Sequence, residues 1–86
     1  MNYEKEGEIL KALGHPVRLR MVEGLMKNEC NVNKMMDVLN IPQSTASQHL
    51  GTLKNKGIVV ARKDGVRTCY KVVDQRVREI IRILKG

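Results

Sequence analysis

The residues best suited to chemistry lie in the stretch from Gln43 to His49, which reads Gln-Ser-Thr-Ala-Ser-Gln-His. Glutamine pairs with adenine through two hydrogen bonds, and serine and threonine hydroxyl groups serve several bases. Short side chains let a helix backbone approach a duplex, and the free N–H groups of a helix N-terminus attract phosphate. The alternative is a capped surface helix with ordinary polar residues, in which His49 packs at the rim of the helix. The residues predicted to read base edges are Gln43, Ser44, Thr45, Ser47, Gln48 and His49.

Cationic side chains gather around the pair Asp64-Gly65, which stands between two runs rich in β-branched residues. An Asp-Gly pair in this setting is a strong signal for the turn of a β-hairpin. We expect the hairpin to contact the DNA backbone or the adjacent minor groove, which adds salt-dependent affinity with little sequence information. The alternative is a solvated charged tip. The residues predicted to contact the backbone are Arg62, Lys63, Arg67 and Lys54.

Hydrophobic spacing indicates a mainly helical chain. Ser44 is predicted to cap the base-reading helix and Asn33 the helix before it, while Gly14 is expected to end the first helix in a left-handed turn. A short helix, a tight turn and a polar-faced helix form a helix-turn-helix, and the basic hairpin after it forms a wing. The predicted fold is mainly α with a small antiparallel β wing, in the order helix, helix, strand, helix, helix, hairpin, helix. The predicted elements are helices over Asn2–Leu13, Pro16–Lys27, Lys34–Leu39, Thr45–Lys56 and Asp74–Lys85, a short strand at Cys30–Val32, and hairpin strands within 58–61 and 66–73.

Length, charge and composition limit the classes of function. We expect one domain spanning residues 1–86, and the net charge of +7 favours a polyanionic partner. No apolar run approaches the ~20 residues that span a bilayer, and the polar start lacks the features of a signal peptide, so we expect a cytoplasmic protein without a membrane partner. The sequence contains no nucleophile–base pair, phosphate loop or glycine-rich fingerprint. Neither an enzymatic activity nor a cofactor is therefore expected.

Three blocks of the chain together resemble a known family. Residues 12–20 read Ala-Leu-Gly-His-Pro-Val-Arg-Leu-Arg, and residues 43–50 read Gln-Ser-Thr-Ala-Ser-Gln-His-Leu. The helix end at 53–59 and the wing at 65–72 complete the pattern, which is similar to that of the ArsR/SmtB family of bacterial and archaeal repressors. The resemblance implies a homodimeric winged-helix repressor that binds double-stranded DNA and releases its operator when an inducer binds. It also implies that the predicted base-reading residues form the family's DNA-reading block.

The metal sites that this resemblance suggests are incomplete. Where the family carries a Cys-x-Cys pair after the short strand, this chain has only Cys30, and the last helix contains no histidine. One Asp and one Glu among arginines do not make a zinc site, so no metal site is predicted. The inducer is left open between an oxidant, a metal, a small molecule and none.

The resemblance brings the two cysteines together in another way. In the winged-helix arrangement that it implies, the short strand at Cys30 pairs with the second wing strand, which holds Cys69, so the thiols are expected within bridging range. Oxidation would strain the wing relative to the base-reading helix and change the affinity for DNA. The alternative is that both cysteines act as small apolar residues in the core.

The terminal helices carry more apolar side chains than a small core absorbs. Two-fold dimers read two half-sites about one helical turn apart, so a second subunit would cover this surface and extend the DNA contact. The residues predicted to pair across the two-fold axis are Ile9, Leu10, Leu13, Val77, Ile80, Ile81 and Leu84.

The leading hypothesis is a dimeric, sequence-specific repressor of an inverted-repeat operator. The alternative is a winged-helix module that binds protein, or binds nucleic acid as an architectural factor, without an inducer. The two differ in specificity, because a repressor should prefer its operator over random DNA by roughly a thousandfold or more.

Overall fold

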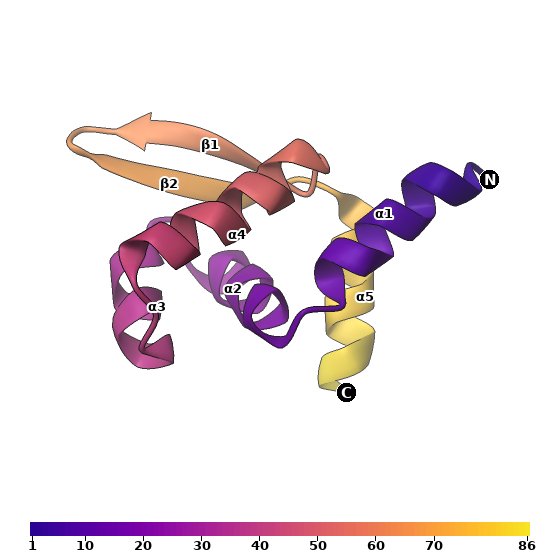
Figure 1. The fold of residues 1–86 in the computed structure, drawn as a ribbon, viewed down its shortest axis with the longest axis horizontal. Coiled ribbons are helices and arrows are strands. Elements are labelled where there is room, and N and C mark those ends of the chain that lie inside the picture. Colours follow the sequence, from indigo (N-terminus) through magenta and orange to yellow (C-terminus); the bar gives the residue numbers. More distant parts are fainter.

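Five helices and one β-hairpin make up the structure, a computed structural model that describes all of residues 1–86. Helices α1 and α5 lie at one end of the molecule, the hairpin and α3 lie at the other, and α2 lies between them (Figure 1). The mainly helical fold with a two-stranded antiparallel wing confirms the predicted winged helix-turn-helix. The elements are α1 (Tyr3–Leu13), α2 (Pro16–Lys27), α3 (Val32–Leu39), α4 (Gln43–Asn55), β1 (Val59–Asp64), β2 (Arg67–Val72) and α5 (Gln75–Lys85).

Side-chain caps fix where the two terminal helices begin. The Oδ1 atom of Asn2 accepts a hydrogen bond from the backbone N–H of Lys5 over 3.1 Å, at the start of α1. The Oδ1 atom of Asp74 accepts from the N–H groups of Arg76 and Val77 over 2.9 and 3.2 Å, at the start of α5. These contacts satisfy N–H groups that have no partner inside the helix.

The register of the hairpin decides which wing residues share a face. Gly65 is the first of two residues between the strands, and its φ of 66° is one that glycine adopts without strain. Arg62 lies opposite Cys69, and Asp64 lies opposite Arg67. Because side chains alternate along each strand and directly opposed residues share a face, these four side chains project from the same side of the hairpin.

The core is a single cluster of aliphatic side chains to which every element contributes except the hairpin tip. Helix α2 supplies Met21, Val22 and Leu25, all of which are fully buried. Leu53 of α4 and Val77 of α5 reach the same cluster from either side. No polar or charged residue is buried, and no buried side-chain polar atom lacks a partner. No helix has the length and apolar character needed to cross a bilayer.

Several local predictions were wrong. Cys30 lies in a turn rather than a strand, and one backbone hydrogen bond, from Tyr70 N to Glu29 O over 2.8 Å, replaces the expected strand pairing. Neither Asn33 nor Ser44 is a cap, because α3 begins at Val32 and α4 at Gln43 without a side-chain cap at either start. The first helix does not end in a left-handed turn, since the φ of Gly14 is −74°.

Candidate nucleic-acid interface and cysteine pair

Helix α4 presents a polar face to solvent. Ala46, Leu50 and Leu53 point into the core at a spacing of four and three, so they bury one side of the helix. The opposite side carries most of the residues predicted to read bases. The exposed ones are Gln43, Ser44, Ser47 and Gln48, and Thr45 is half-buried.

His49 is the member of that set whose side chain is engaged within the protomer. Its Nδ1 atom accepts a hydrogen bond from the Arg18 guanidinium over 3.2 Å, and its ring centroid lies 4.6 Å from that of His15. Burial lowers the pKa of His49 below its ordinary value of 6.5, and the nearby charges of His15 and Arg18 lower it further. The geometry therefore supports the packing interpretation of His49, while its DNA contact stays a prediction.

A hollow of about 470 Å³ separates α4 from the wing. Gln43 and Ser47 line it from α4, and Arg67 and Thr68 line it from β2. Polar groups on two walls suit a strand of nucleic acid that runs between the helix and the hairpin. Thr68 was not among the predicted site residues. Side chains alternate along a strand, so Thr68 lies on the face opposite that of the buried Cys69, and this alternation could have identified it.

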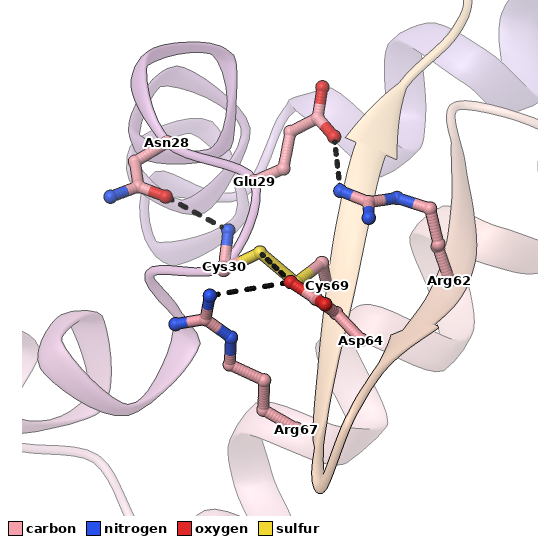
Figure 2. The surroundings of a disulfide bond; sticks show 7 residues. All are labelled: Asn28, Glu29, Cys30, Arg62, Asp64, Arg67 and Cys69. Carbon is pink, nitrogen blue, oxygen red and sulfur yellow. Dashed lines mark hydrogen bonds and ion pairs between the residues drawn. A yellow bond between two sulfur atoms is a disulfide. The ribbon is translucent and has the colours of Figure 1, made fainter.

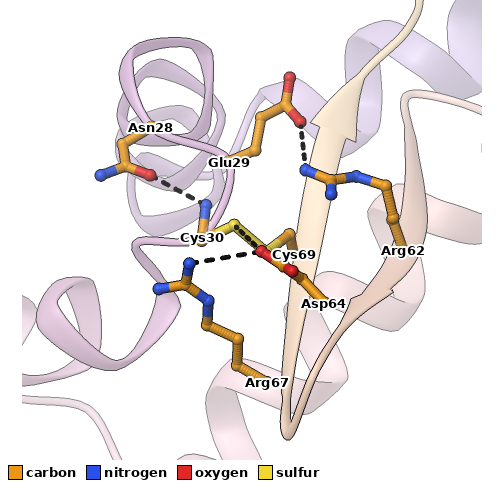
Figure 3. A network of polar contacts seen from close by, with 7 residues as sticks. All are labelled: Asn28, Glu29, Cys30, Arg62, Asp64, Arg67 and Cys69. Atoms are coloured by element: carbon orange, nitrogen blue, oxygen red, sulfur yellow. Dashed lines mark hydrogen bonds and ion pairs between the residues drawn. A yellow bond between two sulfur atoms is a disulfide. The ribbon is translucent and has the colours of Figure 1, made fainter.

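The cationic side chains of the wing are not equally free. Arg62 forms an ion pair with Glu29 over 3.1 Å, and Arg67 forms one with Asp64 over 3.3 Å (Figure 3). Lys63 is exposed and makes no ion pair, and Lys54 is exposed near the end of α4. To reach phosphate, Arg62 and Arg67 must break these ion pairs. This costs little free energy, because ion pairs between exposed side chains contribute roughly 0–1 kcal/mol to stability.

A disulfide bond joins Cys30 in the turn between α2 and α3 to Cys69 in β2 (Figure 2). Cys69 is fully buried and Cys30 is half-buried, so Cys30 is the residue of the pair that reaches the surface. The Asp64 carboxylate reaches over the bond and lies 4.0 Å from the Cys30 sulfur. Asp64 was assigned only to the turn of the hairpin, yet the register places it on the same face as Cys69.

The residues predicted for dimerisation divide into two groups. Ile9, Leu13, Val77 and Ile81 are buried in the core of the protomer. Leu10, Ile80 and Leu84 remain at least partly exposed, and an apolar groove lined in part by Leu10 and Ile80 runs between α1 and α5. Ile83 of α5, which is not among the residues predicted for dimerisation, is also exposed, at 74%. The outward apolar residues of the two terminal helices, named the α1–α5 surface below, are Leu10, Ile80, Ile83 and Leu84.

A family model described as "Bacterial regulatory protein, arsR family" matches residues 15–60, more than half of the chain. The chain belongs to this family. The matched segment holds α2, α3, α4 and the start of β1, which is the helix-turn-helix without the terminal helices. This ArsR-family protein is therefore a DNA-binding transcriptional repressor and not an enzyme.

Two relatives match the ArsR-family protein over nearly its whole length. An uncharacterized HTH-type transcriptional regulator of Methanocaldococcus jannaschii is 48% identical over 83 residues, which cover 95% of this chain and 93% of the relative. The transcriptional repressor PagR of Bacillus anthracis is 35% identical over 85 residues, which cover 98% of this chain and 85% of the relative.

Solved structures share its fold over nearly its whole length. Reduced HlyU from Vibrio cholerae N16961 matches with a TM-score of 0.88 at 32% identity, covering 96% of this chain and 87% of that chain. The homodimeric winged helix-turn-helix DNA-binding domain of Mb0332 from Mycobacterium bovis matches with a TM-score of 0.82 at 27% identity, covering 95% of this chain and 76% of that chain.

Proposed function

We propose that this ArsR-family repressor binds an inverted-repeat operator in double-stranded DNA as a homodimer and acts in the cytoplasm. The observation that carries the proposal is the open polar face of α4, on which Gln43, Ser44, Ser47 and Gln48 are exposed beside a basic hairpin. The N-terminal half of such a helix is the part that contacts base edges in a helix-turn-helix. The wing supplies cations for the flanking backbone, and the net charge of +7 favours the encounter with a polyanion.

The α1–α5 surface supports the dimer. Leu10 is 56% exposed and Leu84 is 65% exposed, and their helices α1 and α5 lie at the end of the molecule remote from the hairpin tip (Figure 1). Covering this surface with its copy would bury the apolar side chains and set two α4 helices on neighbouring half-sites. The homodimeric Mb0332 domain shares the fold, which supports the same assembly for this chain.

The operator proposal is tested by selecting bound duplexes from a random pool and measuring affinity for the selected site. We expect an inverted repeat that binds at least roughly a thousandfold more tightly than random DNA. Uniform affinity for all duplexes would contradict the repressor assignment and favour the architectural alternative. Duplexes that carry one half-site distinguish the dimer, because they should bind much more weakly than the full repeat.

The cysteine pair makes operator binding responsive to thiol redox state. A disulfide in the reducing cytoplasm is usually transient and redox-sensing rather than structural, and the half-buried Cys30 gives reductants access to this one. The bond ties the wing strand β2 to the turn before α3, on the face where Glu29 and Asp64 hold Arg62 and Arg67. We therefore expect oxidation to lower DNA affinity, because the bond fixes the wing strand relative to the turn before α3 and limits its adjustment to the flanking phosphates.

The redox response is tested with the selected operator. We expect the reduced protein to bind more tightly than protein treated with peroxide, with mass spectrometry confirming the bond between Cys30 and Cys69. Cys30→Ser is the matched control, since it removes the accessible sulfur and should bind equally with and without peroxide. A complete disulfide that leaves operator affinity unchanged would remove the switch from the proposal.

A further inference from the structure

Two cysteine sulfurs and one carboxylate, which are all groups that bind Zn²⁺ in proteins, converge where the wing meets the turn between α2 and α3. The two sulfur atoms of Cys30 and Cys69 and a carboxylate oxygen of Asp64 all lie within 4.8 Å of one another. They come from three separate segments, the turn before α3 and both strands of the hairpin (Figure 3). The closeness of Asp64 to Cys30 results from the fold and not from sequence proximity, because 34 residues separate the two.

The distances suit a tetrahedral ion once the disulfide is reduced. With metal–sulfur bonds of about 2.3 Å and a metal–oxygen bond of about 2.1 Å, two ligand sulfurs stand about 3.8 Å apart and a sulfur and an oxygen about 3.6 Å apart. The Asp64 oxygen already lies 4.0 Å from the Cys30 sulfur. Reduction must let the sulfurs separate and the carboxylate move slightly closer, and Cys30 lies in a turn rather than in a helix or strand.

We propose that the reduced protein binds one thiophilic divalent cation, such as Zn²⁺ or Cd²⁺, through the thiolates of Cys30 and Cys69 and the carboxylate of Asp64. Two thiolates and one carboxylate leave the fourth tetrahedral position to water. The site differs from the two incomplete family sites described above, because two of its three ligands come from the hairpin. The proposal extends the redox part of the proposed function and does not depend on operator binding.

The charged groups around the site influence its affinity for the cation. Arg67 pairs with Asp64 over 3.3 Å and opposes a second cation, while Glu29 neutralises the neighbouring Arg62. The Arg67 side chain is 62% exposed, so it can swing into solvent when a metal ion takes the carboxylate. Metal binding therefore frees Arg67 from its intramolecular partner, and Arg67 in turn weakens metal binding.

The cation and the disulfide exclude each other. When a peroxide oxidises the metal-bound dithiolate, the two sulfurs lose two electrons and form the S–S bond, and the metal ion leaves. Hydrogen peroxide accepts the two electrons, takes up two protons from the solvent and forms two molecules of water. One equivalent of hydrogen peroxide therefore releases one equivalent of metal ion.

The test titrates Cd²⁺ alone into fully reduced protein without DNA and follows the ultraviolet absorption of the thiolate–cadmium bonds. We expect one Cd²⁺ per chain, no such absorption from the disulfide form, and release of the ion by one equivalent of hydrogen peroxide. Asp64→Asn changes an exposed side chain, so it should fold normally and weaken Cd²⁺ binding roughly tenfold or more by removing a charged ligand. Arg67→Gln should tighten binding, because it removes the opposing charge.

Asp37→Asn is the matched control, since Asp37 is an exposed carboxylate on α3 outside the site, and it should bind Cd²⁺ like the parent. The proposal is overturned if the reduced protein binds no Cd²⁺, or if Asp64→Asn binds as tightly as the parent. Equal binding by the disulfide form, or one ion shared by two chains, would overturn it as well. None of these outcomes bears on operator binding or on the redox response, which are measured separately with DNA.

Discussion

The guanidinium group of Arg18 donates a hydrogen bond from Nη1 to Nδ1 of His49 over 3.2 Å, and so connects α2 to the exposed helix α4. The same guanidinium donates from Nε to the backbone oxygen of Ala12 over 2.6 Å, near the end of α1. One side chain thereby holds three helices in a fixed relation. Only a neutral His49 accepts this bond, because both ring nitrogens of a protonated histidine carry hydrogen.

The first prediction concerns the pH dependence of stability. The pKa of His49 in the folded protein lies below the ordinary value of 6.5 that the unfolded chain retains, so the unfolded state takes up the proton first as pH falls. The contribution of neutral His49 to stability is complete above pH 6.5 and is lost as pH falls from there through the folded pKa. Urea denaturation at several pH values should therefore show less acid destabilisation for His49→Gln than for the parent. Parallel curves for the two proteins would contradict the depressed pKa.

A second prediction concerns base reading by Gln48. The side chain is exposed on the polar face of α4, and a glutamine with two hydrogen bonds to adenine is worth about 1–3 kcal/mol of discrimination. Gln48→Ala should lower operator affinity by that amount and leave affinity for random DNA nearly unchanged. Gln75→Ala is the control, because it removes a glutamine side chain from α5, away from the predicted DNA interface, and should change neither affinity. An equal loss on both kinds of DNA would show that Gln48 does not read a base.

A third prediction concerns Arg67, which is expected to contact phosphate rather than a base. Arg67→Ala should weaken binding to the operator and to random DNA alike, and should reduce the slope of log affinity against log salt by about 1. Arg82→Ala removes the same charge from α5 and serves as the control for net charge. A loss confined to the operator would instead assign Arg67 a role in base reading.

The helices and the hairpin could be predicted from the sequence because hydrophobic spacing and turn residues act over a few neighbouring residues. The spacing of Ala46, Leu50 and Leu53 fixes the buried side of α4, and the pair Asp64-Gly65 fixes the turn of the hairpin. The starts of α3 and α4 were misplaced, since polar residues inside the first turn of a helix look the same in sequence as residues that cap it.

The partners of the charged surface residues could not be predicted from the sequence. Glu29 meets Arg62 across 33 residues, and Asp64 meets the Cys30 sulfur across 34, through a register that only the folded hairpin defines. The sequence also could not predict which apolar residues of the terminal helices are buried in the protomer and which remain exposed. Periodicity marks Ile80 and Ile81 alike as apolar, whereas packing against α2 buries Ile81 and leaves Ile80 partly exposed.

A fourth prediction tests the cap of α5. Asp74 satisfies two N–H groups at the start of the helix, and loss of such a cap costs about 1 kcal/mol. Asp74→Ala should lower the free energy of unfolding in urea by this amount. Asp37→Ala removes an exposed carboxylate that begins no helix, so it separates the cap from the change in charge. Equal effects of the two substitutions would indicate that the charge alone matters.

The last prediction concerns the dimer and rests on Leu10, which is 56% exposed beside the groove between α1 and α5. A carboxylate at this position disturbs the protomer little, because it reaches solvent in the monomer. It cannot be buried against a second copy without a large desolvation cost. Leu10→Glu should therefore sediment as a monomer at micromolar concentration, where the parent sediments as a dimer, and should bind a full inverted repeat no better than a single half-site. Val38→Glu places the same charge on an exposed apolar residue of α3, which is 74% exposed and lies outside the α1–α5 surface, and should remain dimeric. A dimeric Leu10→Glu, or a monomeric parent, would place the dimer contact elsewhere or remove it.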